Sequence, residues 1–274
     1  MVDGVTGDAV PASAGPARRP PFVSVVVATR DRSDKLVRCV QSLLDGDQSS
    51  LEVVVVDNAP ADTSTRDVVA ARWADDLRVR YLCEPRPGAA RARNVGIQAA
   101  DGEIVAFTDD DVVTDPSWLR LLTDEFANDD VCAVAGLTVP LRLDTAASVW
   151  FEQVSAFGRG AVRATCTLRD DPPPTRLFPF TPPFGATNNL AVRKSIVRAV
   201  GGFDERLGPG TPTRGGEDLD LLARLILTGG TLVYRPDALV RHEHRDSVVE
   251  LRSQMFTYGA GNTAVITKWA LRNP

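Results

Sequence analysis

Apolar and polar residues along the first half of the chain repeat with two periods, one typical of strands and one typical of helices. Short apolar runs with the length of buried strands occupy residues 22–29, 51–56, 79–83 and 104–108. The segments between and after them have helical spacing at residues 34–44, 64–74 and 89–99. In the first of these, Leu36, Val40 and Leu43 form one apolar stripe, with Ser33 or Asp34 as the expected N-cap. Strands that alternate with helices predict a single Rossmann-like α/β domain with a mostly parallel central sheet flanked by helices.

The second half of the chain continues this pattern with longer interruptions. We expect helices at residues 117–126, 146–157, 217–227 and from 195, and strands at 131–139, 186–192 and 231–234. The proline-rich segment 170–185 predicts an irregular loop, which is either functional or a plain surface connection. The expected organisation is a disordered leader at 1–21, one domain at 22–245 and a helical segment at 246–274, where Gly259 and Gly261 weaken a continuous helix.

The overall composition excludes several classes of protein. A formal net charge of −5 over 274 residues lacks the broad basic surface of a nucleic-acid binder, so no nucleic-acid partner is expected. The cysteines, Cys39, Cys83, Cys132 and Cys166, include no CxxC pair, which favours core thiols in a reducing compartment over zinc or redox chemistry. No apolar run reaches the roughly 18 residues of a membrane span, and the N-terminus lacks a signal-peptide pattern. We therefore expect a cytoplasmic protein.

Three consecutive carboxylates, Asp109, Asp110 and Asp111, follow a buried apolar run. Two carboxylates about 4 Å apart repel by roughly 1 kcal/mol in water and roughly 4 kcal/mol near a protein surface. A divalent cation removes that repulsion, and oxygen-only ligands suit Mg²⁺ or Mn²⁺. The alternative is a helix cap or a solvated turn, but Asp115 and Pro116 already supply the cap and the first-turn proline of the next helix. The triplet therefore predicts a metal site.

Polar residues also follow the first two strands, at Thr29 to Arg32 and at Asp57 and Asn58. Ligands of open parallel sheets bind at the carboxyl ends of the strands, so these residues and the acidic triplet predict a nucleotide-sized cleft. Asp57 can accept a hydrogen bond from a base N–H or a ribose hydroxyl, although an Asp after a strand is also ordinary turn chemistry. The chain has no GxxxxGK[ST] loop, which argues against a P-loop NTPase, and no GxGxxG after the first strand.

Two helix starts carry candidate chemistry, and each has a structural alternative. Gly88 opens a helix whose free N–H groups attract anions, with Arg91 and Arg93 either at that anion site or facing solvent. Glu217 and Asp218 begin a later helix after two glycines. A carboxylate there stays ionised and can act as a general base, or it can simply cap the helix.

The chain contains two histidines, His242 and His244. They stand two residues apart after an apolar segment, so on an extended chain they share a face. Neutral imidazole is a good ligand for Mn²⁺, although exposed histidines without any role are equally common.

Taken in order, these motifs resemble those of family 2 glycosyltransferases. The resemblance covers roughly residues 21–245 and is based on residues 25–32, 55–58, 88–96, 109–111, 201–205, 217–218 and 242. It implies a GT-A fold and inverting transfer of a sugar from a UDP-, GDP- or dTDP-sugar to an acceptor hydroxyl, with Mn²⁺ or Mg²⁺ as cofactor. The QxxRW sequence of processive relatives is absent after Asp218, which implies addition of one sugar per encounter.

The resemblance also implies roles for individual residues. Asp218 matches the catalytic base, and Glu217 would orient donor or acceptor hydroxyls. Asp111 matches the direct metal ligand, with Asp109 and His242 as further ligands, His244 as the alternative to His242, and the order within the aspartate triplet left open. Nucleotide contacts are expected from Ala28, Thr29, Arg30, Arg32, Asp57, Arg93, Asp109 and Asp110, and sugar or acceptor contacts from Asn188 and Asn189.

Two other functions remain open at this stage. A sugar-phosphate nucleotidyltransferase shares a nucleotide-binding α/β sheet, but it usually carries an early glycine-rich loop with a basic residue, which this chain lacks. A degenerate fold would bind nucleotide or glycan without turnover. The acceptor is a glycan, a lipid-linked molecule or a small molecule, and the apolar and basic residues of 248–271 predict a helix on the domain or in peripheral contact with the inner face of the membrane.

Overall fold

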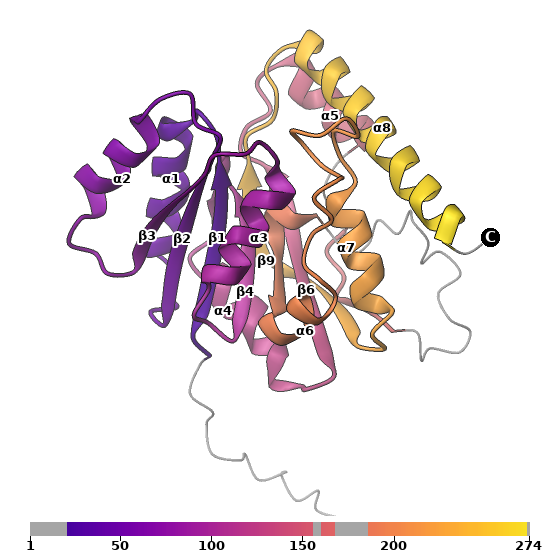
Figure 1. The fold of residues 1–274 in the computed structure, drawn as a ribbon, viewed down its shortest axis with the longest axis horizontal. Coiled ribbons are helices and arrows are strands. Elements are labelled where there is room, and N and C mark those ends of the chain that lie inside the picture. Colours follow the sequence, from indigo (N-terminus) through magenta and orange to yellow (C-terminus); the bar gives the residue numbers. More distant parts are fainter. Residues whose placement is uncertain (1–20, 156–159, 168–185, 273–274) are drawn as a thin grey trace, which may run out of the picture.

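The computed structural model describes residues 21–155, 160–167 and 186–272 (Figure 1). The expected leader lies outside these residues except for Pro21, and the predicted proline-rich loop at 170–185 lies entirely outside them.

The first half of the fold follows the predicted alternation closely. Its elements are β1 (Val23–Thr29), α1 (Ser33–Leu44), β2 (Leu51–Asn58), α2 (Ser64–Trp73), β3 (Val79–Glu84), α3 (Ala89–Ala99) and β4 (Ile104–Asp109). Strand β1 pairs in parallel with β2 and β4, and β2 pairs in parallel with β3. The expected cap of α1 is wrong, because Arg32 is the N-cap residue and makes no side-chain capping bond. The chain turns just before it at Asp31, which has a φ of 54°.

The second half adds further strands and helices, and its strands range from 3 residues in β5 to 12 residues in β9. They are β5 (Val112–Thr114), α4 (Trp118–Asp124), a 3₁₀ turn (Glu125–Ala127), β6 (Val131–Pro140), α5 (Ala146–Ser155), β7 (Ala164–Cys166), a 3₁₀ turn (Thr187–Asn189), β8 (Leu190–Arg193), α6 (Lys194–Ala199), α7 (Glu217–Ile226), β9 (Thr231–His242) and α8 (Val248–Arg272). Asp115 precedes α4 and accepts hydrogen bonds from the backbone N and Oγ of Ser117 at 3.2 and 2.8 Å. The segment 186–192, which was predicted to be one strand, begins with the second 3₁₀ turn, and only the part from Leu190 onward belongs to β8.

The predicted single sheet is confirmed; its long ladders are parallel, and shorter antiparallel ladders are added to them. Its strand order is β3-β2-β1-β4-β8-β6-β9-β5, with β7 paired to β9. Strand β8 runs antiparallel to β4 and β6, and β5 and β7 run antiparallel to β9. Neighbouring parallel strands need a crossover connection, usually a helix. Strand β8 follows β4 only after β5, β6 and β7, so no such unit links it to β4.

Strand β9 is longer than expected and reaches His242 instead of ending at Tyr234. A register shift absorbs the intervening Pro236, because Gly136 pairs with Arg235 and Leu137 pairs with Leu239. The extension gives β5 a partner, and Val112 pairs with His242. It thereby places His242 beside the residues that follow β4.

Helices cover both faces of the sheet (Figure 1). On one face α1, α2 and α4 contribute Leu36, Val69 and Trp118 to one core. On the other face α3 and α7 contribute Ile97 and Leu221 to a second core. The prediction of core thiols holds for Cys39, Cys132 and Cys166, but Cys83 is exposed because it lies on the edge strand β3.

Helix α8 is continuous, so neither Gly259 nor Gly261 interrupts it. Gly261 is instead a contact point: a Cβ added there would lie 2.5 Å from the backbone carbon of Gly215, just before α7. The end of α8 is also tied to α7, where Trp269 Nε1 donates to Asp220 Oδ1 at 3.2 Å. None of the helices in the described part of the chain combines the length and apolar character needed to cross a membrane.

Candidate functional site

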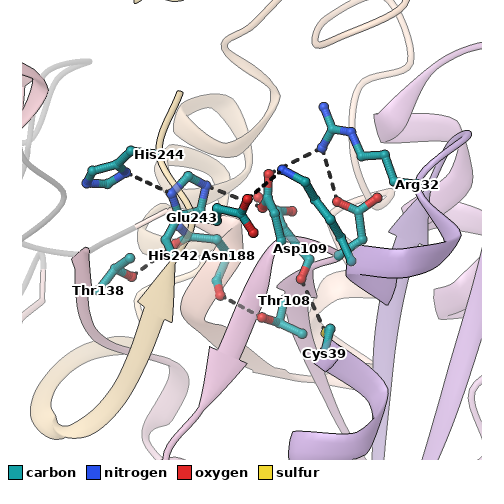
Figure 2. Close-up of polar contacts among 12 residues, drawn as sticks. Arg32, Cys39, Thr108, Asp109, Thr138, Asn188, His242, Glu243 and His244 are labelled. Atoms are coloured by element: carbon teal, nitrogen blue, oxygen red, sulfur yellow. Dashed lines mark hydrogen bonds and ion pairs between the residues drawn. The ribbon is translucent and has the colours of Figure 1, made fainter. Parts of the chain in front are cut away.

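The acidic triplet lies at the carboxyl end of β4, next to the end of β1 (Figure 2). Thr29 Oγ1 donates to Asp110 Oδ2 at 2.7 Å. Arg32 Nη1 donates to Asp110 Oδ1 at 3.1 Å and to Asp111 Oδ2 at 3.2 Å. Burial, together with the charge of Asp111, raises the pKa of Asp110 to about 6. The start of α1 therefore supplies a cation that two neighbouring carboxylates share.

His242 approaches Asp111 from the end of β9, with Nε2 3.3 Å from Asp111 Oδ1. Burial alone would raise the pKa of Asp111, but the charge of His242 and then of Arg32 holds it well below its usual range. Burial likewise would lower the pKa of His242, and Asp111 raises it instead. Both side chains are buried, and Asp111 Oδ1 accepts no hydrogen bond within the described residues.

A buried carboxylate oxygen without a donor, beside an imidazole nitrogen, is a donor pair that suits Mn²⁺ or Mg²⁺. Among the described residues no group of three or more His, Cys, Asp or Glu side chains is arranged to hold a metal ion. The pair still fits, because such ions keep water and substrate phosphate oxygens alongside one or two protein carboxylates. Asp109 is used differently, since it bonds to an arginine of α3.

That arginine is Arg93, and it joins the two acidic sites of the chain. Its Nη2 donates to Asp109 Oδ1 at 3.0 Å, and its Nη1 donates to Glu217 Oε1 at 2.9 Å. The guanidinium is buried and lies over the ring of Phe203, 5.6 Å from its centre. Of the two alternatives for this helix, Arg93 is therefore an interior residue, while Arg91 pairs with Glu205 at 2.7 Å.

Glu217 and Asp218 at the start of α7 have different surroundings. Glu217 is buried, and burial with the charge of Asp218 raises its pKa to about 7 despite the bond to Arg93. A Cβ at Gly208 would lie 2.8 Å from the Glu217 carboxyl carbon, so the glycine-rich loop closes tightly over this side chain. Asp218 is half-buried, and its Oδ1 accepts from the backbone N of Leu219 at 3.2 Å. Asp218 is thus the acid of the two that a substrate can reach.

Asp57 is the residue before the last one of β2, and one of its carboxylate oxygens accepts no hydrogen bond in the described structure. Tyr81 donates to Asp57 Oδ2 at 2.9 Å, while Oδ1 is buried and accepts no hydrogen bond in the described structure. Burial raises the pKa of this acid. Asn58 accepts from the backbone N of Gly88 at 2.8 Å and so fixes the start of α3. Arg30, by contrast, has a side chain 54% exposed.

Asn188 and Asn189, from which sugar or acceptor contacts were predicted, are buried in the 3₁₀ turn before β8. Asn189 accepts from Trp118 Nε1 at 2.8 Å and donates to the carbonyls of Leu137 and Ala238 at 3.0 Å each. Asn188 Oδ1 accepts from Thr138 at 3.2 Å (Figure 2). These amides link β8 to β6, β9 and α4.

Glu152 of α5 is a further residue of this region that no sequence motif predicts, and its Oε1 lies 2.7 Å from His244 Nε2. His244 Nδ1 in turn lies 3.0 Å from His242 Nδ1. The two partners Glu152 and His244 stand 92 positions apart in the chain, and no motif or spacing links an acid at that position to the histidines.

Loss of Arg93 is expected to destabilise the protein strongly, because the buried carboxylate of Glu217 and the half-buried carboxylate of Asp109 would lose the cation that they share. Removing one member of a buried ion pair costs about 3–5 kcal/mol, so Arg93→Met should lower the free energy of unfolding in urea by about that amount. The matched control is Arg91→Met on the same helix. Its pair with Glu205 is partly exposed and should cost about 0–1 kcal/mol. Equal losses of unfolding free energy in the two variants would contradict the claim that Arg93 stabilises the protein more than Arg91 does.

Comparison with known proteins relates this arrangement to one family. The family model described as "Glycosyl transferase family 2" matches residues 24–181, and "Glycosyl transferase family group 2" matches residues 104–273. The chain is 33% identical over 261 residues to the pre-mycofactocin glycosyltransferase of Mycobacterium tuberculosis strain H37Rv, covering 95% of this chain and 49% of that protein. It is 33% identical over 220 residues to the succinoglycan biosynthesis protein ExoO of Rhizobium meliloti, covering 80% of this chain and 59% of ExoO.

The chain thus spans about half the length of these relatives. Among solved structures it resembles the mannosyltransferase PcManGT from Pyrobaculum calidifontis in complex with GDP-Man and Mn²⁺, with a TM-score of 0.66, 22% identity, and coverage of 93% of this chain and 66% of that one. It also resembles S. aureus TarS 1-349 in complex with UDP-GlcNAc, with a TM-score of 0.62, 18% identity, and coverage of 82% and 59%. These likenesses show the predicted GT-A fold. The matched family model, which spans more than half of the chain, shows that the chain belongs to glycosyltransferase family 2.

Proposed function

We propose that this chain transfers one sugar, with inversion, from a nucleoside-diphosphate sugar to an acceptor hydroxyl, assisted by Mn²⁺ or Mg²⁺. The observation that carries the proposal is the double ion pair of Arg93, which makes the acids after β4 and the acids of α7 border one site. Family membership supports transfer over nucleotidyl transfer, and the relatives solved with GDP-Man and Mn²⁺ or with UDP-GlcNAc support a nucleotide-sugar donor.

The donor nucleotide would lie along the carboxyl ends of β1 and β2. The unused Oδ1 of Asp57 is a buried acceptor suited to a base N–H. Arg30 is exposed at the end of β1, beside Ala28 and Thr29, and can reach a phosphate oxygen. Asp111 and His242 would hold the cation, with Asp109 and Asp110 nearer the ribose. When bound, the cation neutralises the charge that develops on the departing diphosphate.

Asp218 would act as the general base in a single displacement. Its carboxylate takes the proton of the acceptor hydroxyl as that oxygen bonds to the anomeric carbon, and the bond from that carbon to the diphosphate oxygen breaks. Attack from the face opposite the leaving group inverts the configuration. Glu217 is buried and bonded to Arg93, so it would position the start of α7 and with it the neighbouring Asp218.

The donor and the metal dependence can be tested by thermal unfolding with UDP-, GDP- and dTDP-sugars, each with and without Mn²⁺. At one hundred times the dissociation constant a ligand stabilises by about 2.7 kcal/mol, which raises the midpoint by roughly 5–10 °C for a domain of this size. We expect such a shift with one donor class when Mn²⁺ is present, and its loss in Asp111→Ala. A shift that does not need Mn²⁺, or that survives in Asp111→Ala, would remove Asp111 as a ligand.

Replacement of Asp218 separates catalysis from binding. Asp218→Asn keeps the shape of the side chain but cannot take a proton, so turnover should fall by about 100-fold or more while donor affinity stays nearly unchanged. Turnover is measured by release of the nucleoside diphosphate, and affinity by calorimetry. Near-normal turnover in this variant would contradict the role of Asp218 as the general base.

Two outcomes would favour the alternative functions. Donor binding by the wild-type chain without turnover on any acceptor would favour the degenerate fold. Pyrophosphate release from a nucleoside triphosphate would favour the nucleotidyltransferase.

We also propose that α5 and α8 make peripheral contact with a membrane that carries a lipid-linked acceptor. Large apolar side chains are exposed on both helices, including Trp150 at 50%, Val154 at 72%, Val249 at 77% and Phe256 at 66%. Wild-type protein should float with vesicles that contain anionic lipid, and replacing Trp150 and Phe256 together by Ser should reduce the floating fraction several-fold. Wild-type protein that stays in the soluble fraction would contradict this proposal.

A further inference from the structure

A line of polar contacts runs from the candidate metal site into helix α5. Asp111 Oδ1 lies 3.3 Å from His242 Nε2, the Nδ1 atoms of His242 and His244 lie 3.0 Å apart, and His244 Nε2 lies 2.7 Å from Glu152 Oε1. Figure 2 shows the imidazoles of His242 and His244 facing each other, and the contact between them joins their Nδ1 atoms. The histidine side chains are 10% and 2% exposed, so bulk water has little access to either ring.

The hydrogen-bonding chemistry of carboxylate and imidazole determines which atom carries the hydrogen in each of these contacts. The Glu152 carboxylate only accepts hydrogen bonds, so His244 Nε2 must carry the hydrogen that lies between them. A neutral His244 then has a bare Nδ1, which accepts a hydrogen bond. The facing Nδ1 of His242 must therefore carry a hydrogen and donate. A neutral His242 with its hydrogen on Nδ1 has its lone pair on Nε2, the nitrogen that faces Asp111.

Packing keeps the outer members of this line in place. The ring of Phe151, next to Glu152 on α5, lies 4.6 Å from the His244 ring. Phe151 is itself buried in a cluster with Leu251 of α8. The helices that pack beside the domain thus hold a carboxylate against His244, although neither helix contributes a residue to the candidate metal site.

We propose that Glu152 and His244 are positioning residues that fix the tautomer and orientation of His242, so that its Nε2 lone pair is presented to a divalent cation beside Asp111. This inference rests on the proposed function for the cation, but the state of the histidines does not. A hydrogen-bond partner on the second nitrogen of a metal-binding histidine fixes its tautomer, and loss of such a partner typically costs about 10- to 100-fold in metal affinity.

The order of hydrogens along Asp111, His242, His244 and Glu152, called the histidine relay, can be tested directly by NMR. The wild-type chain is labelled with ¹⁵N-histidine and measured without metal, and its spectrum holds two imidazoles because the chain has 2 histidines. The spectra are recorded over a pH series from about 6 to about 10, because Asp111 raises the pKa of His242 above the usual imidazole value of about 6.5. We expect His244 to be protonated on Nε2 and bare on Nδ1, and His242 to be protonated on Nδ1. A hydrogen on His244 Nδ1, alone or with one on Nε2, would overturn the relay without any variant being needed.

Variants of Glu152 then test the link to the metal, with Mn²⁺ alone as the probe and the free ion measured by electron paramagnetic resonance. Glu152→Leu removes the acceptor and should weaken Mn²⁺ binding by about 10-fold or more. Glu152→Gln keeps an amide oxygen that can accept from His244 Nε2, so it should retain the tautomer and most of the affinity. Gln153→Leu changes the exposed neighbour on α5 and serves as the matched control.

The outcomes separate this inference from the proposed function. Unchanged Mn²⁺ affinity and an unchanged His242 tautomer in Glu152→Leu would overturn the positioning role, even if transfer activity is present. Equal weakening in Glu152→Leu and Gln153→Leu would also overturn it. Absence of Asp111-dependent Mn²⁺ binding in the wild-type chain would overturn the link to a metal and the proposed cation site together, while the proton pattern of the two rings would still decide the relay.

Discussion

The buried guanidinium of Arg93 is the interaction on which the arrangement of the site depends. Asp109 ends a strand of the parallel half of the sheet, and Glu217 begins a helix more than a hundred positions later; a single arginine donates to both. Buried carboxylates repel each other strongly unless a cation compensates them. By bonding to both acids, Arg93 allows them to lie close together, and it leaves Asp218, one residue beyond Glu217, half-exposed at the same site.

The C-terminal helix stabilises this arrangement from the far side of α7. Asp220, fully buried on α7, accepts from Arg224 at 2.9 Å and from Trp269 at 3.2 Å, and it also pairs with Lys268. Lys268 pairs with Asp204 as well, at 2.8 Å. Helix α8 is thereby fixed to the helix whose first turn carries Glu217 and Asp218, so the segment 248–272 is part of the structural support of the site as well as a candidate membrane surface.

The sequence predicts the first half of the fold well because each of its elements has a local signal. The strands up to β4 are continuous apolar runs, and helix α1 has one apolar stripe. The acids after β4 and at the start of α7 were also recognised as candidates, since strand ends and helix starts are visible in the pattern. By contrast, β5 has three residues, and it is a strand only because β9 extends past Pro236 to meet it. The burial of Arg93 and of Asn189, and the bond between Glu152 and His244, depend on contacts between distant segments that no local pattern encodes.

The charges around the acidic triplet explain why a cation and Arg32 can both have a place there. Arg32 Nη1 is shared between one oxygen of Asp110 and one oxygen of Asp111, and Thr29 occupies the second oxygen of Asp110. The second oxygen of Asp111 is directed away from these donors, toward His242. Because a hydrogen bond from a shared guanidinium compensates only part of two buried negative charges, this oxygen keeps a strong preference for positive charge. A divalent cation held by Asp111 and His242 would satisfy that preference, and Glu152 and His244 would keep the Nδ1 hydrogen of His242 in place.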